Sequence, residues 1–339
     1  MTDRQSLDTT RYAEKIARIR EGRYRKGDFM IADAKDADLS GGIVTGGPRR
    51  DDDGRIVGYR NRAQFLEQMR AILKQDLVDI LLTSAANMEV LSEEGAFEER
   101  GVLAAFRGNE TSDIWGNLRG GDYRAHPALP HRGADLTLAN APLCLYAVTF
   151  NNDAPRDVAM LEAYAAFRAE ARAAGILHFL EVFNPNLDLG FDAAQTGRYV
   201  NDCILRSLAS LTRRERPEFL KVAYNGPEAL EELAGYDPGL VVGVLGGGSG
   251  THRDTFELLA QAERFGARLA LFGRKINGAE DQLTLIAWMR RVADGEATPM
   301  EAVRGYRADL EAAGLRPDRD LESDLAITED VLRPAASAA

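Results

Sequence analysis

The sequence predicts an α/β protein built as a (β/α)8 barrel, the TIM barrel. Short apolar runs alternate with helical patterns along the chain, and this alternation repeats eight times. The runs are apolar on both sides, which is typical of parallel strands covered on both faces. A chain of 339 residues, 45% of them hydrophobic, is long enough to bury such a core.

The predicted strands are these eight apolar runs. They cover Phe29–Asp33, Val78–Thr83, Val102–Phe106, Leu143–Phe150, Ile176–Phe183, Phe219–Tyr224, Leu240–Leu245 and Leu269–Phe272. A doubly wound open sheet shows the same alternation of strands and helices and remains the alternative. The barrel is favoured because eight is the number of strands that closes it.

Several helices between the strands have recognisable ends. Asp153 precedes a helix with Pro155 in its first turn, and Thr251 with Asp254 forms a capping-box pattern. Glycine stops both helices, at Gly175 and at Gly266, since it accepts the left-handed backbone that ends a helix. The predicted helices include residues 155–174, 252–265, 11–20 and 298–313.

We expect a single barrel domain over residues 1–339. Residues 1–27 form an N-terminal helical segment that closes the barrel bottom, and the helix at 298–313 is an extra one at the C-terminus. Residues 325–339 are expected to be a C-terminal tail whose Pro-Ala-rich end frays.

Two connections are long, after the first and the third predicted strand. In the first, residues 34–59, the segments 42–44 and 55–58 flank Asp53-Gly54 and predict a hairpin. The second, residues 107–141, carries four arginines and two histidines. Both connections follow strands, so they lie at the end of the barrel where such folds do chemistry. They are either lids over a site or solvated surface loops.

The composition of the chain limits which binding partners and which cellular location we expect. The formal net charge of −11 argues against nucleic acid or an anionic membrane as partner, although a local basic pocket still allows an anionic substrate. We expect Cys144 and Cys203, which both lie in apolar segments, to be buried thiols of the core and not a disulfide. No apolar run approaches the roughly 20 residues of a membrane span. The N-terminus lacks the apolar core of a secretory signal, so we expect a cytoplasmic protein.

Lys221 is the strongest functional signal. It lies inside the apolar run Phe219–Tyr224 of a chain that has six lysines. A lysine is seldom fully buried unless it is paired or used, and an apolar setting favours the neutral amine that attacks carbonyl groups. We interpret Lys221 as a Schiff-base nucleophile. The alternative is a lysine that reaches solvent at the end of its strand.

Glu181 supports this interpretation from the preceding strand. It is a second charge in an apolar run, and neighbouring strands lie about 4.8 Å apart. A carboxylate beside the amine can move the protons that imine formation and carbon–carbon cleavage require. The alternative is a structural ion pair between Glu181 and Lys221, which is costly to bury for stability alone.

The loops after the last two strands predict a phosphate site. The first is a glycine-rich turn into a capped helix, and the second continues into two cations. Glycine lets backbone approach a ligand closely, a helix N-terminus offers free N–H groups, and barrels often bind phosphate here. The predicted phosphate-binding residues are Gly247, Gly248, Ser249, Gly273, Arg274 and Lys275. A tight turn with a solvated charge pair is the alternative.

Strand one ends with Asp33, Ala34 and Lys35. We expect Asp33 at the barrel mouth, where it can orient substrate hydroxyls or tune the lysine, although it can equally cap the following turn. Lys35 or the arginines of the connection 107–141 are expected to meet a second anionic group, phosphate or sulfonate. The four histidines show no metal-ligand spacing, so we expect neither a metal nor another cofactor.

These residues, in this order, resemble the class I aldolases. The resemblance covers about residues 143–314 and is strongest to the tagatose-1,6-bisphosphate aldolase group, whose relatives include the sulfofructose-phosphate and deoxyribose-phosphate aldolases. It implies that Lys221 forms the Schiff base, that Glu181 is the acid/base, and that the two loops hold the phosphate of dihydroxyacetone phosphate. Two departures concern the other end of the substrate: Asp33 is followed by Ala-Lys, and the segment 107–141 has no counterpart.

The sequence therefore predicts a class I aldolase that cleaves a phosphorylated ketose, with a small-molecule sugar phosphate as its partner. Two other interpretations stay open: a sugar-phosphate sensor on the same barrel, and a barrel lyase or isomerase that forms no imine. Whether the chain forms a homo-oligomer is also left open.

Overall fold

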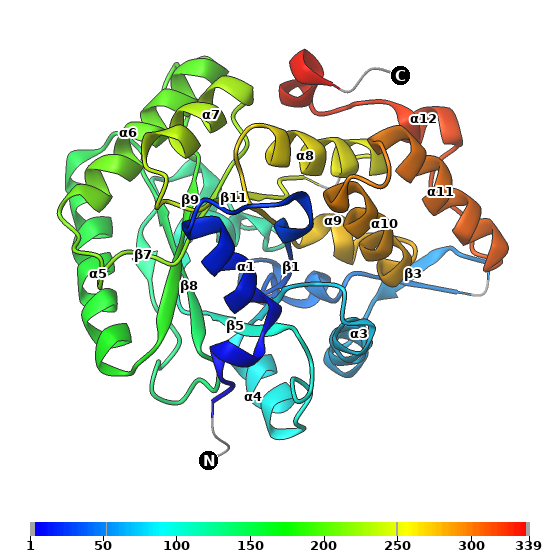
Figure 1. Ribbon diagram of the computed structural model, residues 1–339, viewed down its shortest axis with the longest axis horizontal. Coiled ribbons are helices and arrows are strands. Elements are labelled where there is room, and N and C mark those ends of the chain that lie inside the picture. The colour runs from blue at the N-terminus through cyan, green and yellow to red at the C-terminus, as the bar shows by residue number, and fades with distance from the viewer. Residues whose placement is uncertain (1–3, 52, 249, 337–339) are drawn as a thin grey trace.

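The computed structural model describes residues 4–51, 53–248 and 250–336. Eight parallel strands close into a barrel in the order β1-β12-β11-β10-β9-β8-β5-β4, which confirms the predicted (β/α)8 fold against the open sheet (Figure 1). The barrel strands are β1 (Met30–Lys35), β4 (Ile80–Thr83), β5 (Leu103–Arg107), β8 (Leu143–Thr149), β9 (Leu177–Phe183), β10 (Leu220–Val222), β11 (Val242–Leu245) and β12 (Leu269–Phe272).

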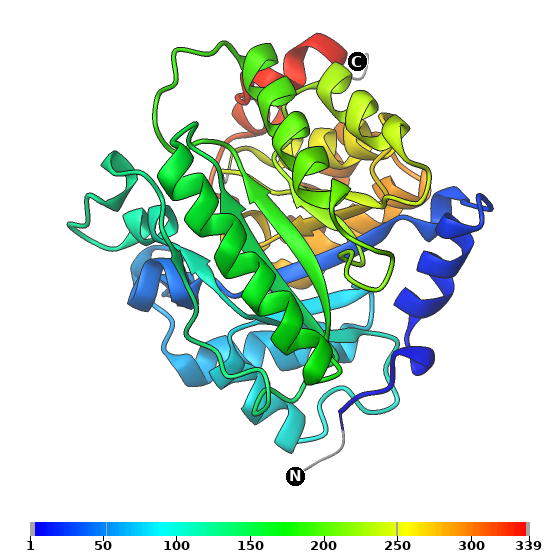
Figure 2. The same cartoon turned by 90° about the vertical axis from the view of Figure 1, so that its left-hand side faces the viewer.

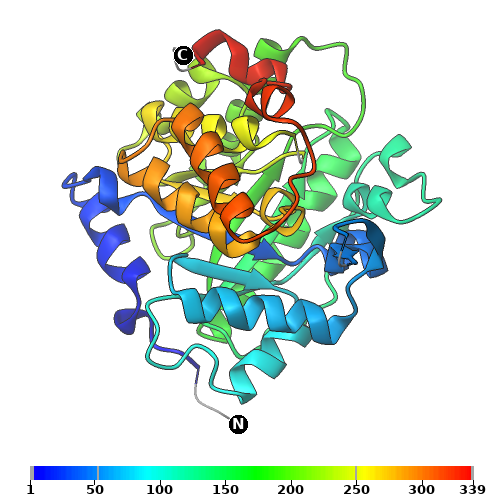
Figure 3. The ribbon, with the colours of Figure 1, turned by 90° about the vertical axis from the view of Figure 1, so that its right-hand side faces the viewer.

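Helices cover the outside of the barrel. Figure 2 shows α5 lying along β8 and β9, and Figure 3 shows α10 and α11 side by side. The helices longer than one turn are α1 (Arg11–Arg20), α3 (Arg62–Gln75), α4 (Ala85–Glu93), α5 (Ala154–Ala173), α6 (Ala193–Ala209), α7 (Pro227–Tyr236), α8 (His252–Arg264), α10 (Gln282–Asp294), α11 (Pro299–Ala312) and α12 (Leu321–Leu325).

The helix starts follow from local sequence chemistry. The Asp153 side chain accepts a hydrogen bond from the Arg156 backbone N–H at the start of α5. At α8, the Thr251 side chain accepts from the Asp254 backbone, and the Asp254 carboxylate accepts from the Thr251 backbone. This is the predicted capping box.

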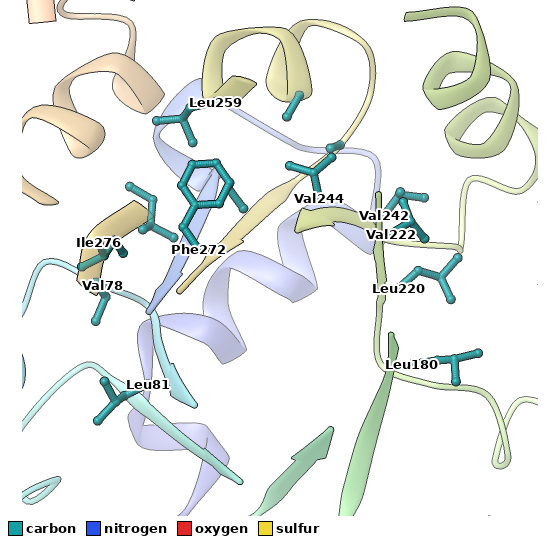
Figure 4. Packing of buried hydrophobic residues seen from close by; sticks show 14 of the residues in the cluster. Val78, Leu81, Leu180, Leu220, Val222, Val242, Val244, Leu259, Phe272 and Ile276 are labelled. Atoms are coloured by element: carbon teal, nitrogen blue, oxygen red, sulfur yellow. The ribbon is translucent and has the colours of Figure 1, made fainter. Parts of the chain in front are cut away.

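Alternate residues of each barrel strand face two separate apolar clusters. One cluster fills the barrel interior and includes Met30, Ala32 and Ala34 of β1. At the N-terminal end of the barrel, α1 adds Tyr12 and Ile16 to it, as expected for a helix that closes the bottom. The other cluster lies between strands and helices, and Figure 4 shows members such as Leu180, Leu220 and Val242 pointing away from the barrel centre. Strand phase therefore decides which side chains can reach the site.

The C-terminal segment, which includes the described part of the expected tail at 325–339, packs on the barrel. α12 and η6 (Asp330–Ala335) lie against α8 (Figure 1). Leu332 is fully buried, and the Gln261 side chain donates to its carbonyl oxygen over 2.8 Å. The segment looks polar in sequence, but buried polar groups of α8 satisfy its backbone. Residues 337–339 lie outside the described residues.

The long connections form small elements instead of barrel helices. After β1 come α2 (Asp38–Gly41), η3 (Gly42–Gly46) and the hairpin of β2 (Pro48–Arg50) and β3 (Ile56–Tyr59). The hairpin is confirmed, but its first strand begins at Pro48 and not at Gly42. After β5, the described chain forms β6 (Glu110–Thr111), η4 (Ser112–Asn117), η5 (Tyr123–Ala125) and β7 (Pro130–His131). α2 packs against η4, so the two connections meet.

The structure also bears on the two cysteines and on the possibility of a membrane-spanning helix. Cys144 and Cys203 are both buried free thiols, as predicted. None of the helices that the structure describes has the length and apolar character needed to cross a bilayer.

Candidate active site

Lys221 and Glu181 meet inside the barrel. They are Cα partners in the parallel register of β10 and β9. Phe219 and Phe179, two positions before them, belong to the interior cluster, so Lys221 and Glu181 point to the same side. Lys221 Nζ lies 2.6 Å from Glu181 Oε1, and the two side chains are 6% and 2% exposed. The structure therefore brings together the two residues on which the sequence prediction depends.

Arg107 adds a second cation at the end of β5. Its Nη1 lies 2.7 Å from Asp36 Oδ2, and its Nη2 lies 3.3 Å from Glu181 Oε2. Its Nε donates to the Asn109 carbonyl oxygen over 2.7 Å, which fixes the plane of the guanidinium. Lys221, Glu181, Arg107 and Asp36 thus form a row of alternating charges, all of them buried.

The charges in this row support one another. Burial opposes ionisation of Asp36, but the cations Arg107 and Lys221 outweigh it and hold the pKa of Asp36 below its ordinary value. Burial likewise opposes the charge of Arg107, and the carboxylates of Glu181 and Asp36 nevertheless raise its pKa. Asp36 therefore stays a carboxylate, and Arg107 stays a guanidinium, although both side chains are buried.

The sequence does not single out Asp36 as a site residue, and it points to Arg107 only as one of the loop arginines expected to meet a second anionic group. The available signal was the two-residue period of β1: Met30, Ala32 and Ala34 face the interior, so position 36 continues on that face. For Arg107 the same period runs from Leu103 through Ala105, both of which belong to the interior cluster.

Asp33 does not lie at the barrel mouth, and that prediction is wrong. It has the opposite phase to Ala32 and Ala34, so it faces the helices and not Lys221. Its Oδ2 lies 3.4 Å from Lys35 Nζ. Burial raises the pKa of Asp33 to about 6, with the Lys35 charge acting against that rise. The error arises because apolar residues occupy both faces of a buried strand, so hydropathy does not reveal its phase.

Lys35 shares this outward phase. Its Nζ donates to Gln282 Oε1 over 2.8 Å and to Asn277 Oδ1 over 3.4 Å. These two hydrogen bonds and the ion pair with Asp33 give the Lys35 ammonium three partners inside the protein. Burial lowers the pKa of Lys35. Lys35 is therefore not placed to meet a second anionic group in the barrel mouth. The sequence predicts that role for Lys35, and the structure does not support it.

A cavity of about 140 Å³ opens onto the ion pair. We call it the catalytic cavity, and α2 and η4 of the two long connections supply part of its wall. It is lined by Ala34, Asp36, Ala37, Ser40, Arg107, Ile114, Asn117, Glu181, Phe183, Lys221, Leu245, Gly246, Gly247, Leu271, Gly273 and Arg274. The predicted nucleophile and the predicted phosphate loops thus share one cavity.

Three predicted phosphate-site residues line this cavity: Gly247, Gly273 and Arg274. Gly247 has φ +63°, a conformation that glycine adopts without strain. Gly248 is exposed beside it, and Ser249 lies outside the described residues. These loops offer backbone N–H groups and a guanidinium on the side of the cavity that β11 and β12 form.

Lys275 points elsewhere. Its Nζ lies 2.8 Å from Glu329 Oε1 in the C-terminal segment, and its side chain is fully buried. It does not line the catalytic cavity, so the expectation that it assists phosphate binding does not fit its placement. The ion pair with Glu329 instead ties the C-terminal segment to α9 (Arg274–Asn277), the short helix after β12.

Hydrogen bonds between asparagine side chains connect the segments that follow β9 and β10 at the C-terminal end of the barrel. Asn184 and Asn225 exchange amide hydrogen bonds of 2.8 and 2.9 Å across the ends of β9 and β10. Asn186 donates to the carbonyl oxygens of Arg124 and His126, over 2.9 and 2.7 Å. The connection 107–141 is therefore anchored to the barrel at η5 and at the residue that follows it.

No metal cluster is visible in the residues that the structure describes: nowhere do three or more histidine, cysteine or acidic side chains gather as ligands. Two of the four histidines have buried partners instead. His178 Nε2 lies 2.8 Å from the Tyr164 hydroxyl, and His252 Nδ1 lies 2.7 Å from Asp324.

Comparison with known proteins rests on structure. No protein-family model matches the chain, and no curated protein matches it significantly. The solved structures that match its fold include the following three. A Schiff-base-forming fructose-1,6-bisphosphate aldolase is 14% identical, with a TM-score of 0.57 over 83% of this chain and 99% of its own. An archaeal fructose-1,6-bisphosphate aldolase, solved with its catalytic lysine bound to a carbinolamine intermediate, is 15% identical, with a TM-score of 0.58 over 84% and 100%.

The third match is a Corynebacterium glutamicum protein. It is 19% identical, with a TM-score of 0.56 over 86% of this chain and 99% of its own. At these identities the likeness concerns the fold. The chain is therefore similar in its barrel fold to class I, Schiff-base-forming aldolases.

Proposed function

We propose that this protein is a class I aldolase, a carbon–carbon lyase that reversibly cleaves a phosphorylated ketose into dihydroxyacetone phosphate and an aldehyde. The observation that carries the proposal is the contact of 2.6 Å between Lys221 and Glu181, buried on the inner face of the barrel beside a cavity. An amine and a carboxylate in this arrangement supply both the nucleophile and the acid/base that imine chemistry needs.

Imine formation begins with a proton transfer. The Lys221 ammonium passes a proton to Glu181, and the neutral amine attacks the ketone carbon. The resulting carbinolamine hydroxyl then takes a proton back from Glu181 and leaves as water. The product is a protonated imine between Lys221 and the substrate, and Arg107 holds the Glu181 carboxylate in place throughout.

The iminium then accepts the electron pair of the C3–C4 bond. As that bond breaks, the proton of the C4 hydroxyl moves to a carboxylate, and the C4 fragment leaves as an aldehyde. We assign the proton acceptor to Glu181, since its Oε2 has no hydrogen-bond partner among the described residues. Protonation of the enamine at C3 and addition of water release dihydroxyacetone phosphate and restore the Lys221 amine.

The phosphate group fits the loops after β11 and β12. Gly247 and Gly273 leave the backbone accessible at the cavity wall, and the Arg274 guanidinium supplies a charge there. Gly248 and Ser249 follow in the same loop and belong to the proposed phosphate site. A phosphate bound here anchors the substrate from a point several atoms away from the reacting carbonyl.

Borohydride reduction in the presence of dihydroxyacetone phosphate tests the proposal. We expect a stable mass increase on the peptide that contains Lys221, because reduction fixes the imine as an amine. The variant Lys221→Met should fold, lose the adduct and lose turnover. Lys74→Met, which changes an exposed lysine of α3, serves as the matched control and should keep both.

Two outcomes would count against the proposal. One is an adduct on a lysine other than Lys221. The other is the absence of any adduct under conditions in which dihydroxyacetone phosphate demonstrably binds, which would instead favour a sugar-phosphate sensor or a barrel enzyme that forms no imine.

A further inference from the structure

A second cavity adjoins the catalytic cavity. It has a volume of about 280 Å³ and lies between the connection after β1 and the short helix α9. We call it the arm pocket. The two cavities share part of their walls, so they lie side by side. The shared residues are Ala34, Ala37, Ser40, Asn117, Gly273 and Arg274.

The sizes of the two cavities suggest how a substrate divides between them. Small-molecule sites in proteins usually measure roughly 300–1,000 Å³. The catalytic cavity, at about 140 Å³, falls well below this range, and the two cavities together fall within it. The catalytic cavity has room for the reacting carbons and the phosphate. The remainder of a longer substrate needs the arm pocket.

Part of the wall of the arm pocket is apolar. It includes Val44 and Pro48 from the connection after β1 and Phe65 of α3, and Ala37 is shared with the catalytic cavity. Phe65 is 4% exposed and belongs to the outer apolar cluster. Contact with such side chains favours an alkyl group over a charged one, because a charge would lose its hydration without gaining a partner.

The polar side chains of the arm pocket are already bound within the protein. The Lys35 ammonium contacts Gln282 and Asn277, and its ion pair with Asp33 completes the set. The Asn277 amide in turn donates to the Thr45 carbonyl oxygen over 2.7 Å. Lys35 thus lines the pocket, but its ammonium already donates its hydrogen bonds to other groups of the protein.

The junction side chains are bound in the same way. Ser40 Oγ donates to the Ala37 carbonyl oxygen over 3.0 Å, and Asn117 Nδ2 donates to the Ile114 carbonyl oxygen over 3.1 Å. The Arg274 side chain has no hydrogen bond or ion pair to the described part of the chain, but it also lines the catalytic cavity, where the proposed function assigns it to the first phosphate. The other polar side chains of the described wall already have hydrogen-bond partners inside the protein.

We propose that the arm pocket binds the aldehyde half of the substrate beyond C4, and that this half ends in an uncharged, apolar group instead of a second phosphate. The inference rests on the proposed aldolase function and names the substrate class of the same site. It follows from the shared wall of the two cavities, the apolar side chains Val44, Pro48 and Phe65, and the internal hydrogen bonds of the polar wall groups.

The test uses the condensation direction with dihydroxyacetone phosphate and three aldehydes. Acetaldehyde is the short reference, pentanal carries an alkyl arm, and glyceraldehyde 3-phosphate carries a charged arm. For the unmodified protein we expect kcat/KM for pentanal to exceed that for acetaldehyde at least about tenfold, the scale of a hydrophobic subsite. We also expect pentanal to exceed glyceraldehyde 3-phosphate.

The variant Val44→Phe fills the arm pocket without touching the catalytic cavity, which Val44 does not line. It should abolish the advantage of pentanal and leave acetaldehyde within about twofold of the unmodified rate, as a change confined to the arm predicts. Val44→Leu adds less volume and should give an intermediate loss, so the test survives if the larger residue prevents folding.

Three outcomes would overturn the inference: a preference for glyceraldehyde 3-phosphate, equal rates for pentanal and acetaldehyde, or an equal fall for all acceptors in both Val44 variants. Borohydride trapping with dihydroxyacetone phosphate alone separates this failure from failure of the proposed function, since that donor does not enter the arm pocket. An adduct on Lys221 without acceptor preference overturns only the inference. No adduct overturns the aldolase itself.

Discussion

The guanidinium of Arg107 lies 3.3 Å from Glu181, between Nη2 and Oε2, on the side of the carboxylate that Lys221 does not occupy. The contact is an ion pair without a hydrogen bond, because neither atom has a hydrogen-bond partner in the described residues. Glu181 Oε2 therefore keeps a lone pair free, which the proposed mechanism uses to accept the proton of a substrate hydroxyl. In that mechanism Arg107 orients the carboxylate and leaves this position open.

Glu181→Gln should keep the shape of this site but lose the proton acceptor. We expect kcat for cleavage to fall by about 10²- to 10⁴-fold, the usual contribution of a positioned acid/base. Imine formation should slow as well, which the rate of borohydride trapping measures. Glu170→Gln, which changes an exposed partner of Arg132, is the control and should remain active. A fully active Glu181→Gln variant would remove Glu181 from the mechanism.

Arg107→Met should change the pH dependence of the reaction. Without Arg107, the pKa of Asp36 is no longer held down by its main cation, so it rises. Protonation of Asp36 breaks the row of charges that surrounds Glu181 and Lys221, so the acidic limb of the rate profile should then move to higher pH, by about one pH unit or more. Arg132→Met removes an exposed arginine of the same connection and should leave the profile unchanged. An unshifted limb in Arg107→Met would show that Asp36 does not control the rate.

Arg274 and Lys275 are neighbours in sequence with different expected roles. Arg274→Met should raise KM for a phosphorylated ketose about tenfold or more, since a charge-assisted hydrogen bond contributes about 1.5–3 kcal/mol. Lys275→Met should leave KM nearly unchanged and lower the melting temperature, because it removes the ion pair with Glu329. Steady-state kinetics and thermal unfolding of both variants check this. The reverse pattern would restore Lys275 to the phosphate site.

His252 should make stability depend on pH. Burial opposes its charge, yet its contacts with Asp324 and Glu280 raise its pKa from 6.5 to about 9. A raised pKa in the folded state stabilises the protein fully below pH 6.5, and this stabilisation is lost as the pH rises through 9. The loss amounts to at most about 3 kcal/mol.

Urea unfolding of the unmodified protein across this pH range measures the effect. The variant His252→Gln should show a smaller dependence, because Gln does not titrate. His126→Gln changes a histidine that is 68% exposed and should behave like the unmodified protein. If His252→Gln and the unmodified protein lose stability equally with rising pH, the imidazole does not carry the charge that we assign to it.

Gly243 should not tolerate a side chain. It is the Cα partner of Lys221 on the neighbouring strand, and a Cβ there would lie 2.5 Å from the Leu269 Cγ atom. We expect Gly243→Ala to cost about 1–3 kcal/mol by overpacking. Gly235→Ala is the matched control in α7, where an added Cβ meets nothing within 4 Å, and it should be neutral or slightly stabilising. Equal stability of the two variants in urea would contradict this reading of the barrel interior.

The fold was predictable because its signals are local. Eight buried strands, the capping box at Thr251 and the proline-started helix after Asp153 each follow from a few neighbouring residues. The C-terminal segment was not predictable in this way. Its order depends on Asp254, Gln261 and Lys275, which lie far away in sequence and accept or donate the bonds that fix it.

The residues of the candidate site likewise include some that the local sequence predicts and some that it does not. Lys221 and Glu181 stand out in sequence because each is a charge in an apolar run, whichever way it points. Asp33 and Asp36 cannot be told apart by composition, since both are aspartates near the end of β1, three positions apart. Only the phase of the strand places one of them against the helices and the other beside Arg107.

By itself, the sequence determined the barrel, the lysine–glutamate pair and the loops expected to hold a phosphate, since strand length, apolar burial and isolated charges are properties of short segments. Tertiary structure alone decided which charges face the interior, that Lys35 and Lys275 are bound elsewhere, and that an apolar pocket adjoins the site. These features arise where distant segments meet, and a charge is available to a substrate only if no other part of the chain has already neutralised it.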